Sequence, residues 1–402
     1  MEPKIQGVIN QESIDSDLLL QPSNTLPATP QIEIVDSISH IQAGDWNKLA
    51  GQHLLLSHAF LNALHESGSA CAATGWTPNY LLLREQGNLT AAMPLYLKSH
   101  SYGEYVFDWA WAEAYQRNGL QYYPKLLSAI PFSPVSANKV LSLNDTSSCA
   151  LLDAALQLAR ESGVSSFHCL FPNVAEAAHL QAQGLMIRSG VQFHWQNPGY
   201  VSFSDFLNGM SRDKRKRIKQ ERHKVRDAGV TFRRLTGTAI TEKDWDFFHR
   251  CYTNTYHQHH SSPYLNRDFF ARIGHSMSEQ TLLIIAEKDG APIAAALNFY
   301  GGDTLYGRYW GSTEFISGLH FEACYYQTIE FCIEQKITVF EGGAQGEHKL
   351  ARGFLPVPTF SAHWLARPEF ASAVARYLEQ ETKGVDSYLS ELNERQPFKL
   401  KS

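Results

Sequence analysis

The chain has 402 residues, of which 44% are hydrophobic, 12% aromatic and 19% charged, and its formal net charge is −5. This apolar and aromatic content excludes intrinsic disorder over most of the chain, and the length predicts two or three domains. So small a net charge gives the chain as a whole no general affinity for nucleic acid or for an anionic membrane.

The N-terminal segment, residues 1–36, is predicted to be a disordered tail. Gln, Ser, Asn and Pro make up 12 of its first 30 residues, and its apolar run, Leu18 to Leu20, is too short for a signal peptide. No stretch of the chain approaches the roughly 18 consecutive apolar residues of a membrane span. Six scattered cysteines without a CxxC pair are typical of reduced thiols. These features predict a cytoplasmic protein.

Two strand–turn–strand patterns recur along the chain. The first has apolar runs at 80–83 and 89–98, and the second has them at 282–286 and 292–300. Superposing Gly87 on Gly290 requires an offset of 203 residues (290 − 87), which also aligns Tyr122-Tyr123 with Tyr325-Tyr326. A helix is predicted to begin at each double tyrosine. The repeat indicates a duplicated α/β unit, with domains predicted at 37–198 and 199–402.

The second half continues with a predicted strand at 304–310, a loop at 311–318, a helix at 319–335 and a strand at 337–340. This order places the N-terminus of a helix beside a sheet. Free backbone N–H groups and the helix dipole make such a terminus suited to phosphate.

Several blocks of sequence carry a family resemblance. They are residues 100–111 (HSYGEYVFDWAW), 122–127 (YYPKLL) with 131–135 (PFSPV), 192–195 (QFHW), 305–311 (LYGRYWG), 319–322 (LHFE) and 340–354 (FEGGAQGEHKLARGF). Together they resemble the bacterial FemAB-like predicted N-acyltransferases of the GNAT superfamily, from about Trp46 to about Phe398. The resemblance implies an α/β fold with two tandem GNAT-like acyl-CoA N-acyltransferase domains, whose mixed, mostly antiparallel sheets are flanked by helices.

The resemblance also implies transfer of an acyl or aminoacyl group to a small-molecule amine, in a cleft that we expect between the two domains. An acyl-CoA donor is expected, with acyl carrier protein and aminoacyl-tRNA as alternatives, and no metal. The chain departs from ordinary acetyltransferases because residues 311–318 replace the R/QxxGxG/A loop, which argues against acetyl-CoA bound in the usual way.

Three residues are candidates for catalysis. Glu341 ends a predicted buried strand and is followed by two glycines that allow close backbone approach. A buried carboxyl can have a pKa near neutrality and act as general base for an amine. His320 and Glu322 open the predicted helix and are further candidates, although a Glu in the first turn of a helix is often only a partner of its dipole.

Substrate-binding candidates lie in both halves. Arg308 stands in a strand between aromatic residues, where burial requires an anionic ligand or a carboxylate partner. Asp108 lies among aromatic residues that include Trp109, and such an acidic, aromatic surface can bind an amine or a cation. Alternatively, residues 100–111 form a packed aromatic core with acids at the surface. The full set of substrate-binding candidates is Asp108, Trp109, Tyr123, Arg308, Gln345, His348, Lys349 and Arg352, and the last four form either a binding loop or a solvated turn.

The segment from Arg212 to Arg226 holds nine Lys or Arg and two acids, a local charge of +7 within a remainder of −12. We expect a helix that Ser211 caps, with a narrow apolar stripe formed by Ile218 and Val225. It attracts RNA or a phosphate-rich cofactor, or else it links the domains as a solvated helix. No aromatic residue is interleaved for base stacking.

The run His257-Gln258-His259-His260 lacks nearby Cys, Asp or Glu, so no metal site is predicted there. Two hypotheses remain open: an N-acyltransferase, or a non-catalytic recognition module that binds a cell-wall or amino-sugar ligand in the same cleft.

Overall fold

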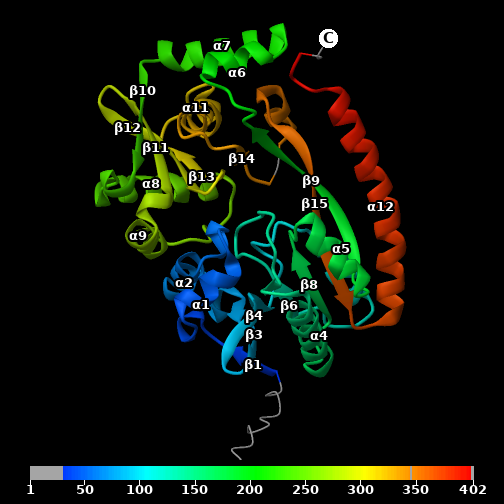
Figure 1. Ribbon diagram of the computed structural model, residues 1–402. Helices are drawn as coiled ribbons and strands as arrows, with labels where there is room; N and C mark the ends of the chain where they lie inside the picture. Colours follow the sequence, from blue (N-terminus) through cyan, green and yellow to red (C-terminus); the bar gives the residue numbers. More distant parts are fainter. Residues whose placement is uncertain (1–29, 345, 400–402) are drawn as a thin grey trace, which may run out of the picture.

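The computed structural model describes residues 30–344 and 346–399, and their strands form two sheets (Figure 1). The smaller sheet has the order β1 (Gln31–Val35), β3 (Tyr80–Glu85), β4 (Asn88–Met93) and β7 (Leu141–Ser142). The larger sheet has the order β10 (Val230–Thr236), β11 (Thr281–Lys288), β12 (Ala291–Gly301), β13 (Thr304–Ser312), β14 (Val339–Glu341), β9 (Met186–Gln196), β15 (Leu355–Leu365), β8 (Ser166–Leu170), β6 (Lys125–Ser128), β5 (Leu95–Lys98) and β2 (Trp76–Pro78).

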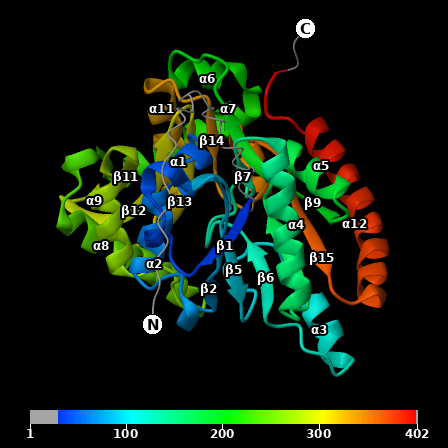
Figure 2. The ribbon, with the colours of Figure 1, turned by 60° about the horizontal axis from the view of Figure 1, so that its bottom comes forward.

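Helices flank both sheets (Figures 1 and 2). They are α1 (Ala43–Ala50), α2 (His58–Glu66), α3 (Trp109–Arg117), α4 (Asp145–Glu161), α5 (Val174–Ala182), α6 (Phe203–Gly209), α7 (Arg212–Asp227), α8 (Glu242–Gln258), α9 (Arg267–Ser276), α10 (Leu319–Phe321), α11 (Gln327–Glu334) and α12 (Pro368–Glu394). A π-helical turn, Glu322–Tyr326, joins α10 to α11, and such turns are frequent at functional sites. The long helix α12 packs along β9 and β15.

The duplicated hairpin predicted from the sequence is present in matching detail. In β3–β4 the loop is Gln86-Gly87 and in β11–β12 it is Asp289-Gly290, with positive φ at all four residues, as a two-residue type I′ turn requires. A register shift follows Leu83 in the first hairpin and Ala286 in the second. The two shifts are 203 residues apart, so the hairpins are equivalent down to their bulges.

The second match at this offset is wrong. Tyr325 and Tyr326 lie inside the π-helical turn, but Tyr122 and Tyr123 lie in a loop before β6 and begin no helix. Topology gives the true counterpart: β6 and β8 are parallel neighbours connected through α4, as β13 and β14 are through α10 and α11. The connections differ in length between the halves, so one offset cannot align both hairpin and helix.

The halves exchange strands where they meet. β9, from the first half, pairs with β14 of the second half, whereas β15, from the second half, pairs with β8 of the first. β9 and β15 also pair with each other, from Leu355↔His194 to His363↔Met186. The larger sheet therefore contains strands from both sides of the predicted domain boundary between residues 198 and 199. The position of that boundary stays a prediction from the sequence.

A shared hydrophobic core also joins the halves. Phe60 of α2 packs its ring 5.8 Å from that of Phe269 in α9 and 5.7 Å from that of Phe299 in β12. All three side chains are buried, within a cluster that extends from Ile38 to Tyr309. Burial of such rings is the main favourable contribution to folding, so it holds the two halves in one arrangement.

The predicted tail is too long at its C-terminal end. Residues 1–29 lie outside the described residues, but Gln31–Val35 form β1, which pairs antiparallel with β3. Its Ile32 and Ile34 are β-branched, as residues in strands often are, and both are exposed on this edge strand. Within residues 30–344 and 346–399, no helix combines the length and hydropathy that crossing a membrane requires.

Candidate active site

Strands β13 and β14 part beside the place where the halves meet. Their parallel pairing covers only three residue pairs and ends at Tyr306↔Glu341. Immediately beyond, β13 bulges against β12, because Asn298 pairs with Gly307 and Leu297 with Tyr309, which leaves Arg308 as the extra residue. A cavity of ≈ 90 Å³ opens in the gap.

Glycine makes this geometry possible. A Cβ on Gly307 would come within 2.8 Å of the Phe340 ring, and one on Gly342 within 2.9 Å of the Phe354 ring. Both approaches are closer than side chains tolerate. The Glu-Gly-Gly sequence therefore keeps backbone exposed to the cavity at the end of β14.

Glu341 is the last residue of β14, and its side chain is almost buried. Its Oε2 accepts no hydrogen bond from the part of the chain that the structure describes. Burial raises the pKa of Glu341 to about 8, although Arg308 and Lys139 act to lower it. A carboxyl group of this kind exchanges a proton near neutral pH, which is what a general base or acid requires.

Two buried groups of the first half complete the surroundings of Glu341. His194 of β9 places Nε2 4.0 Å from Oε2 of Glu341, and burial lowers the pKa of His194 to about 4. Lys139 is buried, and its Nζ donates to the carbonyls of Ala137 (2.7 Å) and Phe171 (3.0 Å). Sequence reasoning missed both as site residues, because only the strand exchange and the packing of the halves bring them to Glu341.

Arg308 stands between two cavities. Its Nη2 donates to the carbonyl of Phe132 in the first half at 2.5 Å, and its Nε has no partner among the described residues. Besides the gap between β13 and β14, Arg308 lines a cavity of ≈ 260 Å³ whose walls include Tyr105 and Tyr256. An incompletely paired guanidinium at a cavity is suited to a carbonyl oxygen or an anion.

His320 and Lys349 lie on the second-half side of the gap. His320 lines the cavity between the rings of Trp310 and Tyr325, each with its centroid 5.4 Å away, and burial lowers the pKa of His320 to about 4. The Nζ of Lys349 donates to the carbonyl of Gly343 at 2.8 Å, and burial lowers the pKa of Lys349 to about 8. Of the sequence candidates, Arg308 and His320 thus line this cavity, and Glu341 and Lys349 lie next to Gly342 in its wall.

Glu322 and Arg352 are engaged elsewhere. Glu322 receives hydrogen bonds from Nε (3.1 Å) and Nη2 (2.9 Å) of Arg222 in α7. Arg352 donates from Nη2 to Glu221, also in α7, at 2.7 Å and lies over the Phe321 ring. These contacts hold α7 against the helix that begins at Leu319.

The structure describes only one of the two remaining candidates in this loop, His348 and Gln345. His348 is exposed and its Nε2 is 3.1 Å from the hydroxyl of Tyr325. Gln345 lies outside the described residues.

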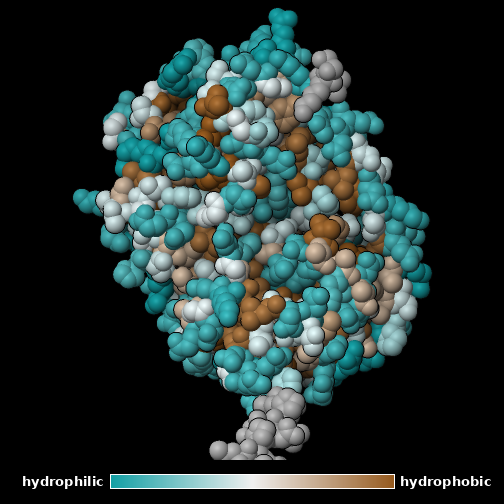
Figure 3. Space-filling model, viewed as in Figure 1, coloured by the Kyte–Doolittle hydropathy of each residue, from teal (hydrophilic) through white to brown (hydrophobic). Residues whose placement is uncertain are grey.

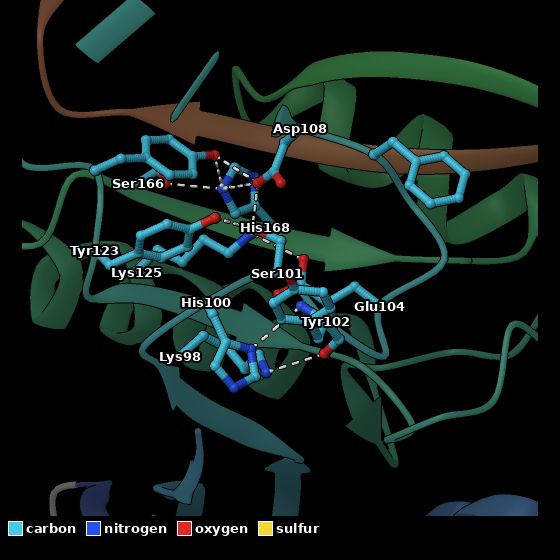
Figure 4. Close-up of polar contacts among 12 residues, drawn as sticks. Lys98, His100, Ser101, Tyr102, Glu104, Asp108, Tyr123, Lys125, Ser166 and His168 are labelled. Carbon is cyan, nitrogen blue, oxygen red and sulfur yellow. Dashed lines mark hydrogen bonds and ion pairs between the residues drawn. The ribbon is translucent and has the colours of Figure 1, made fainter. Parts of the chain in front are cut away.

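Asp108, a candidate from the first half, belongs to a separate buried network (Figure 4). Lys125 donates to Asp108, to Glu104 at 2.8 Å and to Ser101 at 2.8 Å. Although burial alone would raise it, Lys125 lowers the pKa of Asp108, whereas burial raises the pKa of Glu104 to about 7.

Near this network, the hydroxyl of Tyr123 is 2.8 Å from Ser101 Oγ, and Trp109 is exposed with its ring 5.1 Å from that of Tyr102. Tyr105 and Phe107 line cavities near the junction of the halves, whereas Asp108 lines neither of these cavities.

The basic segment forms α7 as predicted, with Ile218 and Val225 buried. Ser211 occupies the N-cap position, but its side chain makes no capping hydrogen bond. Across the described ranges, no group of three His, Cys, Asp or Glu side chains gathers as metal ligands would.

Comparisons with known proteins agree with this architecture. A family model described as FemAB-like, peptidoglycan biosynthesis and recognition, matches residues 37–400. Among curated proteins, none matches the chain.

Two solved structures illustrate the likeness in fold. The crystal structure of FemX has 13% identity and a TM-score of 0.53, over 82% of this chain and 98% of that one. The C-terminal domain of a protein provisionally named lysylphosphatidylglycerol synthetase, from Agrobacterium fabrum, has 10% identity and a TM-score of 0.52, over 86% and 97% of the chains. The predicted α/β fold, with mixed and mostly antiparallel sheets flanked by helices, is confirmed.

Proposed function

The chain belongs to the FemAB-like family, and on that premise we propose that it is a transferase, which moves an acyl or aminoacyl group onto an amine where its two halves meet, with Glu341 as general base. The observation that carries the proposal is the buried Oε2 of Glu341, which lacks a hydrogen-bond partner among the described residues and borders a gap between parting strands.

The proposed reaction requires a neutral amine. Its nitrogen attacks the carbonyl carbon of the donor, the carboxylate of Glu341 takes a proton from that nitrogen, and the bond from the carbonyl carbon to the leaving group breaks. The leaving thiolate or alkoxide then receives that proton from Glu341, which regenerates the carboxylate, so the products are an amide and a free thiol or alcohol. General base catalysis of this kind contributes about 10²–10⁴-fold in rate.

Charge that develops on the donor's carbonyl oxygen needs stabilisation. Beyond Tyr306, β13 has β12 on one side but no strand on the side that β14 has left, so the backbone there borders the cavity. Backbone N–H groups and the guanidinium of Arg308 are the donors within this gap. His320, which burial keeps neutral, borders the same cavity and positions the reacting groups.

The proposed donor is an acyl-CoA bound in an unusual way. Gly318, at the start of the helix where ordinary acetyltransferases hold pyrophosphate, lies against α7: a Cβ there would be 3.5 Å from the Glu221 carbonyl oxygen. Residues 311–318 also replace the R/QxxGxG/A loop of ordinary acetyltransferases, which is a second argument for an unusual mode of acyl-CoA binding. Aminoacyl-tRNA is the second candidate, and the exposed cations of α7 favour it.

One experiment separates the donors and also tests the recognition-module alternative. The full chain is incubated with an acyl-CoA, an acyl carrier protein or an aminoacyl-tRNA, each with amino-sugar and peptide amines, and products are identified by mass spectrometry. An amide product that forms from one donor class, and fails to form with Glu341→Gln, supports the proposal. Ligand binding without any product refutes the enzyme and leaves the recognition module.

A further inference from the structure

One face of α7 places three cationic side chains and one histidine over a cavity. Lys219, Arg222, His223 and Arg226 follow the i, i+3, i+4, i+7 spacing of a single helix face, and all four line a cavity of ≈ 620 Å³. The volume is in the range of about 300–1,000 Å³ that small-molecule sites occupy. Helix α7 lies beside α6 and above α11 on the outer side of the second half (Figure 1).

Two of these cations are free to bind a ligand. Arg222 is committed to Glu322 and Glu330, and His223 to Asp227. In contrast, no carboxylate of the described residues lies within ion-pair distance of Lys219 or Arg226, and Arg226 donates only to Nδ1 of His223. Among the described residues, Glu322 is the one carboxylate on the cavity wall, and Arg222 neutralises it.

The rest of the wall is mainly apolar. Phe203 and Leu207 come from α6, and Val230 and Phe232 come from β10. The guanidinium of Arg222 lies 4.5 Å from the centre of the Phe203 ring, which places positive charge directly against this apolar wall. Hydrophilic side chains cover the surface where α7 lies, at the top of the view in Figure 3.

We propose that this cavity binds an organic phosphate with an apolar body, whose phosphate is held by Lys219 and Arg226 and whose body packs on Phe203, Leu207 and Phe232. Two unpaired cations seven residues apart suit a dianion better than a single carboxylate. The site is separate from the gap beside Glu341, because the helix from Leu319 lines that gap with His320 and Tyr325 and this cavity with Glu322 and Gln327. The inference does not rest on the proposed reaction.

The test is calorimetric titration of the full chain with phenyl phosphate, inorganic phosphate and phenol. The test variant is Lys219→Gln with Arg226→Gln, and the matched control is Lys216→Gln with Lys224→Gln. The control removes the same charge from exposed positions of α7 that do not line the cavity. Neither pair of residues takes part in the ion pairs that attach α7 to the described part of the fold.

We expect phenyl phosphate to bind more tightly than inorganic phosphate, and phenol not to bind. The test variant should weaken phenyl phosphate binding about tenfold or more, as loss of a charge-assisted hydrogen bond does, while the control keeps the affinity of the original chain. Equal losses in the two double variants, or no binding of phenyl phosphate, would overturn the site and reduce α7 to a diffuse basic surface. Equal affinity for inorganic and phenyl phosphate would overturn the apolar part of the proposal.

A second set of probes distinguishes the sources of such a phosphate. Adenosine 3′,5′-bisphosphate represents a soluble nucleotide, and vesicles that contain phosphatidylglycerol represent a lipid headgroup. Either one assigns the source if its binding depends on Lys219 and Arg226 and not on Lys216 and Lys224. Failure of both, after phenyl phosphate has bound, identifies a site for smaller phosphate esters.

Discussion

Glu341 and His194 are direct partners across β14 and β9, with Oε2 and Nε2 4.0 Å apart, although 147 residues (341 − 194) separate them in the chain. The pair forms because β9, a strand of the first half, pairs with β14 of the second half. The proposed base is therefore in place only when both halves are folded together.

Replacing Glu341 with Gln should lower kcat by about 10²-fold or more, because the amide keeps the shape of the side chain but cannot accept the proton. Steady-state kinetics on the identified substrates measure the change, and a circular dichroism spectrum checks the fold. The control is Glu369→Gln, an exposed first-turn residue of α12. Full turnover by the Glu341 variant would remove this carboxyl from the mechanism.

The activity of the original chain should rise with pH through about 8, since the ionised form of Glu341 is the base and burial raises its pKa to about 8. A pH–rate profile of kcat/KM on one substrate measures this. A profile that is already level at pH 6 would contradict the assignment.

The same group should affect stability. Between its ordinary pKa of 4.5 and about 8, the folded chain keeps a proton on Glu341 that the unfolded chain has lost. The folded state binds more protons in this window, so this contribution to the free energy of unfolding falls as pH rises. Urea denaturation at pH 5 and pH 9 should show a smaller loss with Glu341→Gln than with the original chain; equal losses would argue against the raised pKa.

Lys139→Met should move the pH–rate profile to higher pH, because Lys139 acts to lower the pKa of Glu341. The plateau of kcat at high pH should stay close to that of the original chain. The carbonyls of Ala137 and Phe171 lose a donor, which costs about 1–3 kcal/mol of stability, so profiles are recorded well below the melting temperature. An unshifted midpoint would show that Lys139 does not act on Glu341.

Glu322→Gln should destabilise the chain by about 2 kcal/mol while leaving kcat unchanged, because Glu322 pairs with Arg222 and lines the cavity beside α7 rather than the one between β13 and β14. Urea denaturation and kinetics on the same preparation measure both effects. Arg217→Ala, which removes an exposed pair with Glu221, is the control and should cost under about 1 kcal/mol. A large fall in kcat without a change in stability would return Glu322 to the catalytic candidates.

The local features of this protein can be predicted from its sequence. Both hairpins and the helix that starts at Leu319 follow from apolar runs and turn residues, and Glu341 stands out because two glycines follow a buried strand. The roles of Lys139 and His194 depend on contacts between distant segments, so no local pattern contains them. For the same reason Arg352 and Glu322 resemble site residues in the sequence, although they are paired with Glu221 and Arg222, which are 131 and 100 residues away.

The exchange of β9 and β15 also constrains how this chain can be divided. A cut between residues 198 and 199 would give one fragment that carries β9 without β14, and another that carries β15 without β8. Each fragment would expose an open strand edge that fits the other fragment, as in a split reporter protein. Gene fusion or duplication of one half would therefore not create a second working unit, because each half is completed by a strand that its neighbour supplies.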